Sequence, residues 1–408
     1  MSDVTLDMFD AWLKDDEFAA ITAHQLLQSV EGAEGVIFPP TYAATTEGQK
    51  GNYNIDYFEG EFQAKVSYRN QNQEKIESDI RHEKGGNVCL INSVGAEANR
   101  VEPLFKPEKK DGKYASLVPQ VLIEVRNKTD EVVAEINLLD AGHRAGDAIV
   151  RFTPHGVTVF EAFKEYLDNG NALQLAKIAP TSIVFGVWDS RGTQAKLPRV
   201  FRSIVRAYNV RPLKRSAQFN RAMKYVENGV IDEKLDKGEG DKNPLSREGF
   251  KDNPATGAPG GVIVDGDIRR DITINLSAIR RLQAPNSQNP KQTDADQALK
   301  LRRYILGLSL VAATARTQDK FDLREGCQLR VKPGFTMGWN LVPFEGTDQA
   351  LSYLTGELSL AYAKAAADSF VVGGPYPPVR FDQKTAEKWL ELDKKAQDKL
   401  RREKPMTK

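Results

Sequence analysis

Positive charge is concentrated in one segment of this 408-residue chain, between residues 191 and 215. The segment has no Asp or Glu, although the chain as a whole has 57 Lys and Arg against 56 Asp and Glu. A solvated face normally mixes both signs, because like charges side by side repel one another. A guanidinium group can hold two phosphate oxygens at once, so an anchored row of arginines suits a polyanion. The eight basic residues are Arg191, Lys196, Arg199, Arg202, Arg206, Arg211, Lys214 and Arg215.

Apolar residues interleave with the basic ones around Arg199–Val210, which indicates that this part is anchored in the fold. Its β-branched content favours a strand. The spacing of Arg199, Arg202 and Arg206 would equally suit a helix, so both assignments remain open. In either case Arg202 and Arg206 share one side of the element.

Further basic residues lie outside this segment, while acidic residues gather elsewhere, at Asp15–Glu17 and Asp232–Asp241. No basic amphipathic helix with exposed aromatic residues accompanies them, so the asymmetry of charge favours a nucleic acid over a membrane. Trp188 and Phe38 are candidate stacking platforms for bases, with core packing as the alternative for both. The further basic residues are Arg144, Arg151, Arg269, Arg270, Arg280, Arg281, Lys300, Arg302 and Arg303.

Signals for catalysis are sparse. The sequence has no Walker A loop, no G-x-S-x-G elbow and no C-x-x-C pair, and its four histidines lack zinc-ligand spacing, so we expect no metal and no cofactor. One segment, "LLDAGHRAGDAIVR", places Asp140, His143, Arg144 and Asp147 close together. A general acid–base role, a ligand contact by His143 and Arg144, and a structural turn with Arg144 paired to Asp140 or Asp147 all remain open, with the acid–base role the least favoured.

Length and composition describe a soluble protein with a sizeable core. The hydrophobic content is 40%, which suits two or three domains or one domain with large insertions. No apolar run is long enough for a membrane span, and the acidic N-terminal stretch lacks the apolar region of a signal peptide. Cys89 and Cys327 lie in partly apolar contexts and are expected to be buried free thiols. We therefore expect a cytoplasmic protein.

Hydrophobic periodicity predicts a mixed α+β fold around a mostly antiparallel sheet. Loop-like insertions are expected at residues 45–87, 214–261 and 283–294. Helices are predicted over Asp3–Val30, from Asn92 or Ser93 to Pro103, over 293–316, and over the charged segment 383–404. Strands are predicted at 34–44, 87–92, around the turn "NKTDE" in 117–141, at 181–190, at 271–279 and at 326–334.

Five segments, in this order along the chain, carry a resemblance to a known family. The sequence resembles the RAMP-superfamily backbone protein (Cas-seven group) of type I-G, formerly I-U, CRISPR effector complexes, from about Val36 to Lys332. The "VWDSRGTQAKLPR" part is long and unusual and therefore the most specific. The segments are "LINSVGAEANRVEP", "LLDAGHRAGDAIVR", "PTSIVFGVWDSRGTQAKLPRVFRSIVRAYNV", "GGVIVDGDIRRDITINLSAIRRL" and "LRRYILGLSLVAATARTQDKFDLREGCQLR".

The resemblance implies an RRM-like (ferredoxin-like) antiparallel palm with inserted fingers and a β-hairpin thumb. The palm would span residues 34–335, with the insertions at about 45–87 and 214–261. Residues 1–33 and 336–408 would be N-terminal and C-terminal helical extensions. The chain departs from the family in two places: "SVGAEANR" has Gly95, Ala96 and Glu97 where a more polar, Gln-containing run is expected, so this helix is expected to contact something different, and the glycine-rich loop typical of many RAMP proteins is not recognisable.

The resemblance also implies a function. The protein would be a non-catalytic subunit that polymerises along a CRISPR guide RNA and presents it for pairing with target DNA. Its partners would be the guide, further copies of itself in a helical filament and other subunits of the interference complex. The candidate RNA-binding residues are Asn99, Arg100, His143, Arg144, Trp188, Arg191, Gln194, Lys196, Arg199, Arg202, Arg206, Arg269 and Arg270.

Two alternatives remain. The first is a metal-dependent endoribonuclease like the backbone subunits of type III complexes, with Asp189 or Asp147 as the loop aspartate, although no carboxylate cluster in the sequence supports a metal at either. The second is an RNA-binding module unrelated to CRISPR, which would bind short RNA as a monomer.

Overall fold

The computed structural model describes residues 4–43, 51–70, 72, 74–82, 85–107, 112–286, 292–315, 321–392 and 395–397. It is built on a curled sheet of nine strands in which all the strand pairs are antiparallel. The predicted α+β class with an antiparallel sheet is therefore confirmed. The strands lie in the order β16 (Phe321–Arg324), β17 (Cys327–Val331), β1 (Phe18–Ser29), β15 (Ile268–Asn275), β12 (Phe201–Tyr208), β7 (Asn87–Asn92) and β4 (Ile55–Tyr57), while β19 (Gly338–Pro343) pairs with β1 and with β20 (Gln349–Ala350).

The two faces of the sheet differ in what covers them. Helices α2 (Val94–Val101) and α9 (Ala295–Thr314) pack on one face, against β12 and β15, and α10 (Gly356–Phe370) packs on α9. Side chains alternate along a strand and directly opposed residues share a face. The register pairs Ser203 with Ile272, which places both on the helix-covered face. Arg202 and Arg206 therefore belong to the opposite face.

The interior has two apolar clusters. The larger lies between the sheet and the helices and includes the almost wholly apolar middle of α9, which begins at an Asp294 cap as predicted. The smaller lies inside the curl of the sheet, around Ile91, Val205 and Phe321. Cys89 and Cys327 belong to this second cluster and are buried free thiols, as expected.

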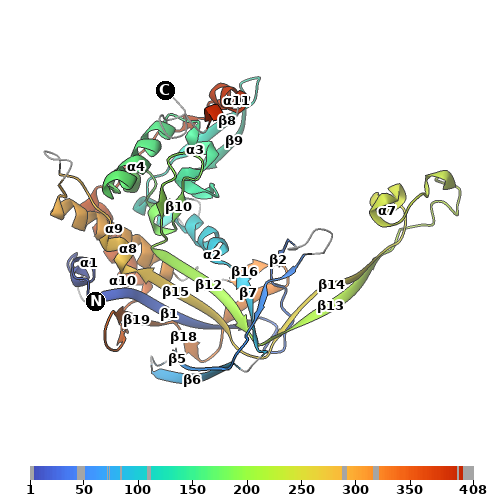
Figure 1. Cartoon of the computed structure of the whole chain (residues 1–408), viewed down its shortest axis with the longest axis horizontal. Helices are drawn as coiled ribbons and strands as arrows, with labels where there is room; N and C mark the ends of the chain where they lie inside the picture. The colour runs from blue at the N-terminus through green and yellow to red at the C-terminus, as the bar shows by residue number, and fades with distance from the viewer. Residues whose placement is uncertain are drawn as a thin grey trace.

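A lobe rich in short helices stands on one end of the sheet (Figure 1). It continues from α2 and returns to the sheet through the hairpin β10 (Val187–Trp188) and β11 (Lys196–Leu197). Its elements are η1 (Glu102–Phe105), η3 (Ala115–Leu117), β8 (Leu122–Arg126), β9 (Val132–Asn137), η4 (Leu138–Asp140), η5 (Arg144–Gly146), α3 (Ala148–Arg151), α4 (His155–Asn169), α5 (Leu173–Ile178) and α6 (Pro180–Val184), joined by β21 (Val379–Arg380), which pairs with β8, and α11 (Gln383–Glu391).

Hairpins extend from the sheet at two of the predicted insertions. The longer, β13 (Val210–Phe219) with β14 (Asn253–Val264), connects β12 to β15 and projects away from the helical lobe (Figure 1). Its end carries η6 (Glu233–Leu235), η7 (Gly240–Lys242) and α7 (Pro244–Arg247). The shorter pairs β5 (Phe62–Asn70) with β6 (Lys75–His82). The remaining elements are α1 (Asp10–Lys14), β2 (Thr41–Tyr42), β3 (Asn52–Tyr53), α8 (Leu276–Arg280) and β18 (Phe335–Thr336).

Several predicted elements are confirmed. The strand at 87–92 is β7, and the following helix begins after Ser93, whose hydroxyl accepts a hydrogen bond from the Ala96 N–H. The strand pair around "NKTDE" is β8 and β9, and the segments 271–279 and 326–334 contain β15 and β17. For Arg199–Val210, the strand alternative is correct, because residues 201–208 form β12.

Three predicted elements are wrong. Most of Asp3–Val30 is not helix: only α1 is helical, and Phe18–Ser29 is a central strand of the sheet, bonded on both sides. Residues 181–190 begin as helix α6, with Pro180 in its first turn, and only Val187–Trp188 is strand. The segment 336–408, expected to be helical, begins with the strand β19 of the main sheet before α10 and α11.

The described part of the segment 34–44, residues 34–43, is mostly irregular and contains the short strand β2. The predicted segments 45–87, 283–294 and 383–404 lie partly outside the described residues. Within the described part of the chain, none of the helices is both long enough and apolar enough to cross a bilayer.

Candidate nucleic-acid interface

The hairpin β10–β11 presents aromatic and basic side chains to solvent. Trp188 is 56% exposed, so its alternative role in core packing is wrong. The Lys196 Nζ lies 5.7 Å from the centroid of the Trp188 ring, within reach of a cation–π contact. Arg191 and Gln194 are exposed on the loop between the two strands. An exposed indole beside free cations is a platform on which a base can stack while its phosphates are neutralised.

Two exposed guanidiniums continue this surface onto β12. Arg199 and Arg202 have no carboxylate within ion-pair distance among the residues that the structure describes. Burial lowers the pKa of Arg199, and the nearby charges of Arg144 and Arg202 lower it further. Cations grouped so closely repel one another, and a bound anion would relieve this repulsion.

The face of the sheet without helices also carries polar groups, but these pair with one another. Arg206 lies opposite Arg269 in the register of β12 and β15 and is half-buried. Arg269 donates to the hydroxyl of Tyr208 over 2.8 Å, and its Nε lies 2.8 Å from Asp271 Oδ1. The same carboxylate oxygen lies 2.7 Å from the Nδ1 of His24. Arg269 is therefore held inside a network within the protein.

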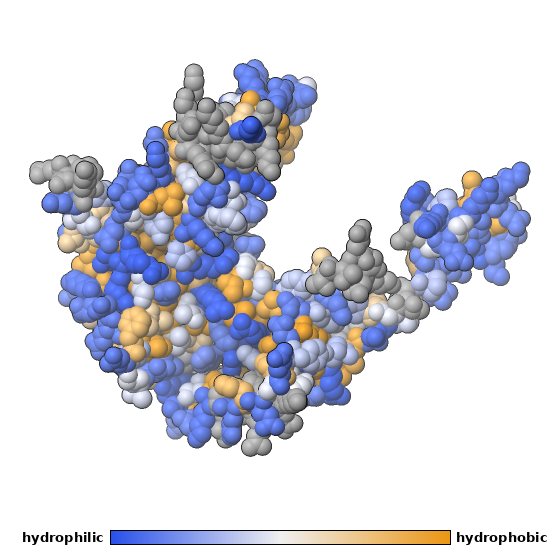
Figure 2. Space-filling model, viewed as in Figure 1, coloured by the Kyte–Doolittle hydropathy of each residue, from blue (hydrophilic) through white to orange (hydrophobic). Residues whose placement is uncertain are grey.

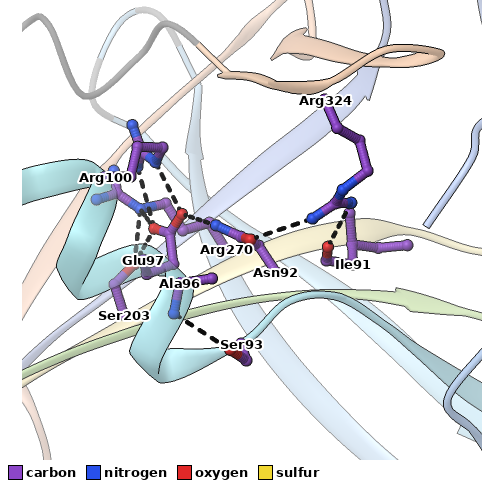
Figure 3. Close-up of polar contacts among 9 residues, drawn as sticks. All are labelled: Ile91, Asn92, Ser93, Ala96, Glu97, Arg100, Ser203, Arg270 and Arg324. Carbon is purple, nitrogen blue, oxygen red and sulfur yellow. Dashed lines mark hydrogen bonds and ion pairs between the residues drawn. The ribbon is translucent and has the colours of Figure 1, made fainter. Parts of the chain in front are cut away.

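The most buried of the predicted arginines is Arg270. It is fully buried, and its Nε lies 3.3 Å from Oε2 of Glu97, a carboxylate that is itself fully buried (Figure 3). Ser203 donates to the same oxygen over 2.6 Å and accepts from Arg270 over 2.9 Å. Because a buried charge needs a partner of opposite sign, and Glu97 and Arg270 supply this to each other, the arrangement is structural. The predicted RNA contact of Arg270 is corrected accordingly.

Arg100 shares this network. Its guanidinium makes two hydrogen bonds to Glu97, of 2.9 and 3.0 Å, and its side chain is only 17% exposed. Asn92 donates to Glu97 over 2.7 Å, and Arg324 from β16 donates to the Ile91 carbonyl over 3.0 Å (Figure 3). The network thus ties α2 to the sheet. Glu97, one of the residues at which the sequence departs from the family pattern, is thus the residue that joins α2 to the sheet.

Arg144 is also directed inward. Its Nε donates to Glu102 over 2.7 Å, and its Nη1 donates to the Gly186 carbonyl over 3.2 Å. Neither Asp140 nor Asp147 is its partner, so the predicted pairing is wrong. Because the Arg144 side chain is only 7% exposed, its predicted contact with RNA is corrected in the same way. His143 stays exposed, with its Nδ1 3.4 Å from Asp147.

The two loop aspartates of the endoribonuclease alternative make contacts within the protein. Asp189 is buried and lies 2.9 Å from Arg151, while Asp147 caps α3 by accepting from the Ile149 N–H. In the described ranges, no three His, Cys, Asp or Glu side chains gather as metal ligands. The residues offered for the endoribonuclease alternative are therefore occupied by structural contacts.

The structure thus divides the thirteen predicted residues by accessibility. Those directed outward lie on α2, just before η5 and along β10–β12, and those directed inward lie in ion pairs. The exposed ones are Asn99, His143, Trp188, Arg191, Gln194, Lys196, Arg199 and Arg202, with Arg206 half-buried, and the paired ones are Arg100, Arg144, Arg269 and Arg270.

Strand parity could have identified one of the inward residues. Ile272 and Ile274 point to one side of β15, and Arg270 falls on the same side. The departure from the family pattern draws attention to Glu97, but no local signal identifies it as the partner of Arg270, since a single acidic residue on a short helix is ordinary. His24 and Asp271 were also missed, because they meet only when β1 and β15 pair.

The surface between the helical lobe and the long hairpin is hollowed, and much of its wall is hydrophilic (Figure 2). The hairpin β13–β14 adds Arg215, whose guanidinium lies 5.3 Å from the ring centroid of Phe38. Phe38 and Arg215 therefore lie together at the hairpin β13–β14.

Comparison with known proteins gives one family. A model described as CRISPR-associated protein GSU0053 matches residues 21–212, slightly under half of the chain. The matched part runs from β1 through the helical lobe to the start of β13 and includes the β10–β11 hairpin. No curated protein matches the sequence. The family match indicates a CRISPR-associated protein.

Proposed function

We propose that this protein is a non-catalytic backbone subunit that binds CRISPR guide RNA in a type I-G interference complex. The observation that carries the proposal is a set of exposed cations beside the exposed Trp188. These cations, which have no carboxylate within ion-pair distance among the described residues, are Arg191, Lys196, Arg199 and Arg202. Charges without internal partners are available for phosphates, and an exposed indole is available for a base. The family match supports the association with CRISPR complexes.

The topology supports the finer assignment to an RRM-like palm of the RAMP type. Strand order β19–β1–β15–β12, with α2 and α9 on one face, is the 4-1-3-2 arrangement of a ferredoxin-like sheet if β19 takes the place of the last strand. On this assignment the hairpin β13–β14, which joins the second and third palm strands, is the thumb, and β5–β6 is a finger.

In this function the protein holds the guide by its backbone and leaves sequence recognition to base pairing. Copies would follow one another along the guide in a helical filament, together with the other subunits of the complex. Because phosphate contacts dominate such binding, the affinity should fall steeply as salt rises.

The test uses the full chain, co-expressed with its partner subunits and a guide RNA. The variant Arg199→Glu with Arg202→Glu should lose guide-dependent particles, because two phosphate contacts become repulsive. The matched control, Lys364→Glu with Lys388→Glu, makes the same charge change at exposed residues of α10 and α11 and should assemble normally. Equal RNA retention by both variants at moderate salt would refute the proposal.

Two further measurements separate the alternatives. Particles that lengthen with the guide support the filament, whereas a monomer bound to short RNA without length dependence favours an isolated RNA-binding module. Incubation with complementary RNA and Mg²⁺ should leave the RNA intact, and evenly spaced cuts would favour an endoribonuclease.

A further inference from the structure

The loop between β10 and β11 is organised around one buried carboxylate. Asp189 is only 4% exposed, although the loop residues around it are polar. Its Oδ2 accepts from the backbone N–H of Thr193 over 2.6 Å and from the Thr193 hydroxyl over 3.0 Å. Its Oδ1 accepts from the Nη2 of Arg151 over 2.9 Å. Both carboxylate oxygens are thus engaged from inside the protein.

The backbone of the loop closes around the same residue. The carbonyl of Asp189 accepts from the N–H groups of Gly192 and Gln194, over 3.3 and 3.0 Å, and its own N–H donates to Ala195 over 2.9 Å. A side chain at position 192 would place its Cβ 2.3 Å from the Asp189 carboxylate, so the turn requires glycine there. Gln194 has a positive φ of 67°, and its side chain donates to the Ser190 carbonyl. The loop therefore has a single defined shape.

Arg151 fastens this loop to the helical lobe. The same Nη2 that meets Asp189 also donates to the Gly146 carbonyl over 3.0 Å. Gly146 itself packs under the hairpin, since a Cβ at this position would lie 3.2 Å from the Trp188 carbonyl. The loop is held both from within and from the lobe on which it rests.

The opposite side of the loop carries the exposed cations. Arg191 projects from the turn, and Lys196 follows it beside Trp188. The clamp thus lies beneath the loop, and the side chains offered to RNA lie above it. Ordering a free loop costs about 1–2 kcal/mol per residue, and a loop that is already ordered avoids this loss on binding.

We propose that Asp189, held by Arg151 and Thr193, is a positioning residue that fixes the β10–β11 loop in its RNA-binding shape before RNA arrives. This inference rests on the proposed function and deepens it. Asp189 is not expected to touch the RNA. It acts through the backbone of Gly192–Gln194 and thereby sets the place of Arg191.

The experiment compares Asp189→Asn with the wild-type full chain by measuring guide-RNA affinity over a range of salt concentrations. The amide keeps one acceptor oxygen but loses the charge and the second acceptor, so it cannot serve both Arg151 and Thr193, and the loop loosens while every cation remains. We expect the affinity to fall about tenfold at each salt concentration, with an unchanged slope of log Kd against log salt. Arg191→Ala should instead lower that slope by about one. An unchanged affinity, or a slope lowered as in Arg191→Ala, would overturn the inference.

A matched control tests whether the effect belongs to this loop. Asp382 at the start of α11 makes the same kind of contacts, accepting from the Thr385 N–H over 3.0 Å and from the Thr385 hydroxyl over 2.6 Å. Asp382→Asn should leave RNA binding unchanged. Loss of affinity in both variants would show a general effect on stability and overturn the positioning role.

Amide hydrogen exchange separates this inference from the proposed function. Amide exchange at Gly192–Gln194 should be faster in Asp189→Asn than in the wild-type protein. Thr193→Val keeps the ion pair between Asp189 and Arg151 and should show a smaller increase. It serves as the test variant if Asp189→Asn fails to fold. Equal exchange would refute the clamp whether or not RNA binds. If the wild-type protein does not retain guide RNA, the proposed function fails first, and the exchange result still decides whether the clamp exists.

Discussion

Arg270 and Arg202 lie on neighbouring strands and have opposite surroundings. Arg270 is fully buried on β15, against Glu97 and Ser203, whereas Arg202 is exposed on β12 without an ion-pair partner in the described part of the chain. The register pairs Arg202 with Thr273 and Ser203 with Ile272, so the two arginines lie on opposite faces of the sheet. Two regions of positive charge that look alike in the sequence are therefore physically distinct.

The difference shows what decides the role of an arginine in this protein. Each of the inward arginines Arg100, Arg144 and Arg270 has a buried carboxylate within reach. The pairs Arg270–Glu97 and Arg144–Glu102 join separate elements of the fold, whereas Arg100 and Glu97 lie on the same helix. Along β10–β12, Asp189 is turned inward to Arg151, and the exposed cations Arg191, Lys196, Arg199 and Arg202 have no carboxylate within ion-pair distance in the part of the chain that the structure describes. Removal of a buried partner leaves an uncompensated charge, while removal of an exposed cation mainly weakens binding to a polyanion.

The largest expected effect is on stability, from Glu97→Gln. The neutral amide leaves Arg270 buried without its counter-charge and weakens both hydrogen bonds from Arg100. We expect the free energy of unfolding to fall by about 3–5 kcal/mol, measured by denaturant unfolding. Glu161→Gln, at an exposed position of α4, is the control and should change little. A loss below about 1 kcal/mol would mean that the buried network is not what holds α2 to the sheet.

A second expected effect is on the pH dependence of stability, to which the carboxyl groups of Glu97 and Glu102 contribute with opposite signs. Burial raises the pKa of Glu97, but the charges of Arg270 and Arg100 and the hydroxyl of Ser203 outweigh it and lower the pKa to about 2. Its contribution to stability is present above pH 4.5, the ordinary value, and is lost as pH falls toward 2. The contribution is on the order of 3 kcal/mol.

Glu102 behaves in the opposite way. Burial raises its pKa to about 7, and the one guanidinium of Arg144, with Thr181, offsets only part of this. The 2.7 Å contact with Arg144 favours the charged form, but Oε1 is buried with no hydrogen-bond partner within the described residues, so burial prevails and the pKa of Glu102 stays raised. Its contribution is full below pH 4.5 and is lost as pH rises through 7. Unfolding measured from pH 3 to 8 should lose the high-pH decline in Glu102→Gln, and an unaltered profile would contradict this assignment.

The sequence predicts elements whose signals are local. Ser93 caps α2, Asp294 caps α9, and alternation predicts β15, because each signal lies within the element itself. The strand β1 was mistaken for helix because it is bonded on both sides and buried on parts of both faces, which removes simple alternation.

For the candidate site, the sequence predicts which residue types are present but not which side chains pair with one another. The row of cations at 191–206 is visible in the sequence, and most of it is exposed in the structure. Arg144 was expected to pair within its own turn, but its partner is Glu102, which lies 42 residues earlier. Such a pair depends on how the helical lobe packs, and no local pattern encodes it.

A third prediction compares the same substitution at the exposed Arg202 and at the buried Arg270. Arg202→Ala should weaken guide-RNA binding by about 1–2 kcal/mol, roughly tenfold, and lower the salt slope by about one, with little change in the unfolding midpoint. Arg270→Ala should do the reverse in protein that remains folded: a strong loss of stability, because Glu97 is left buried beside a cavity, and an unchanged salt slope. A salt slope lowered by Arg270→Ala would place that guanidinium on the RNA and erase the distinction.

The smallest effect is expected at Arg211, which is exposed and also paired. Its guanidinium makes two hydrogen bonds to Asp265, of 2.7 and 2.9 Å, across the base of the β13–β14 hairpin. An exposed pair of this kind contributes little because solvent screens it, so Arg211→Ala should leave the free energy of unfolding nearly unchanged. Its loss in RNA affinity should also be smaller than that of Arg202→Ala, because Asp265 already neutralises the charge. Guide-RNA affinities measured in parallel for Arg211→Ala and Arg202→Ala check this order. An equal loss of affinity in the two variants would show that the RNA binds any exposed arginine, whether or not it has an ion-pair partner.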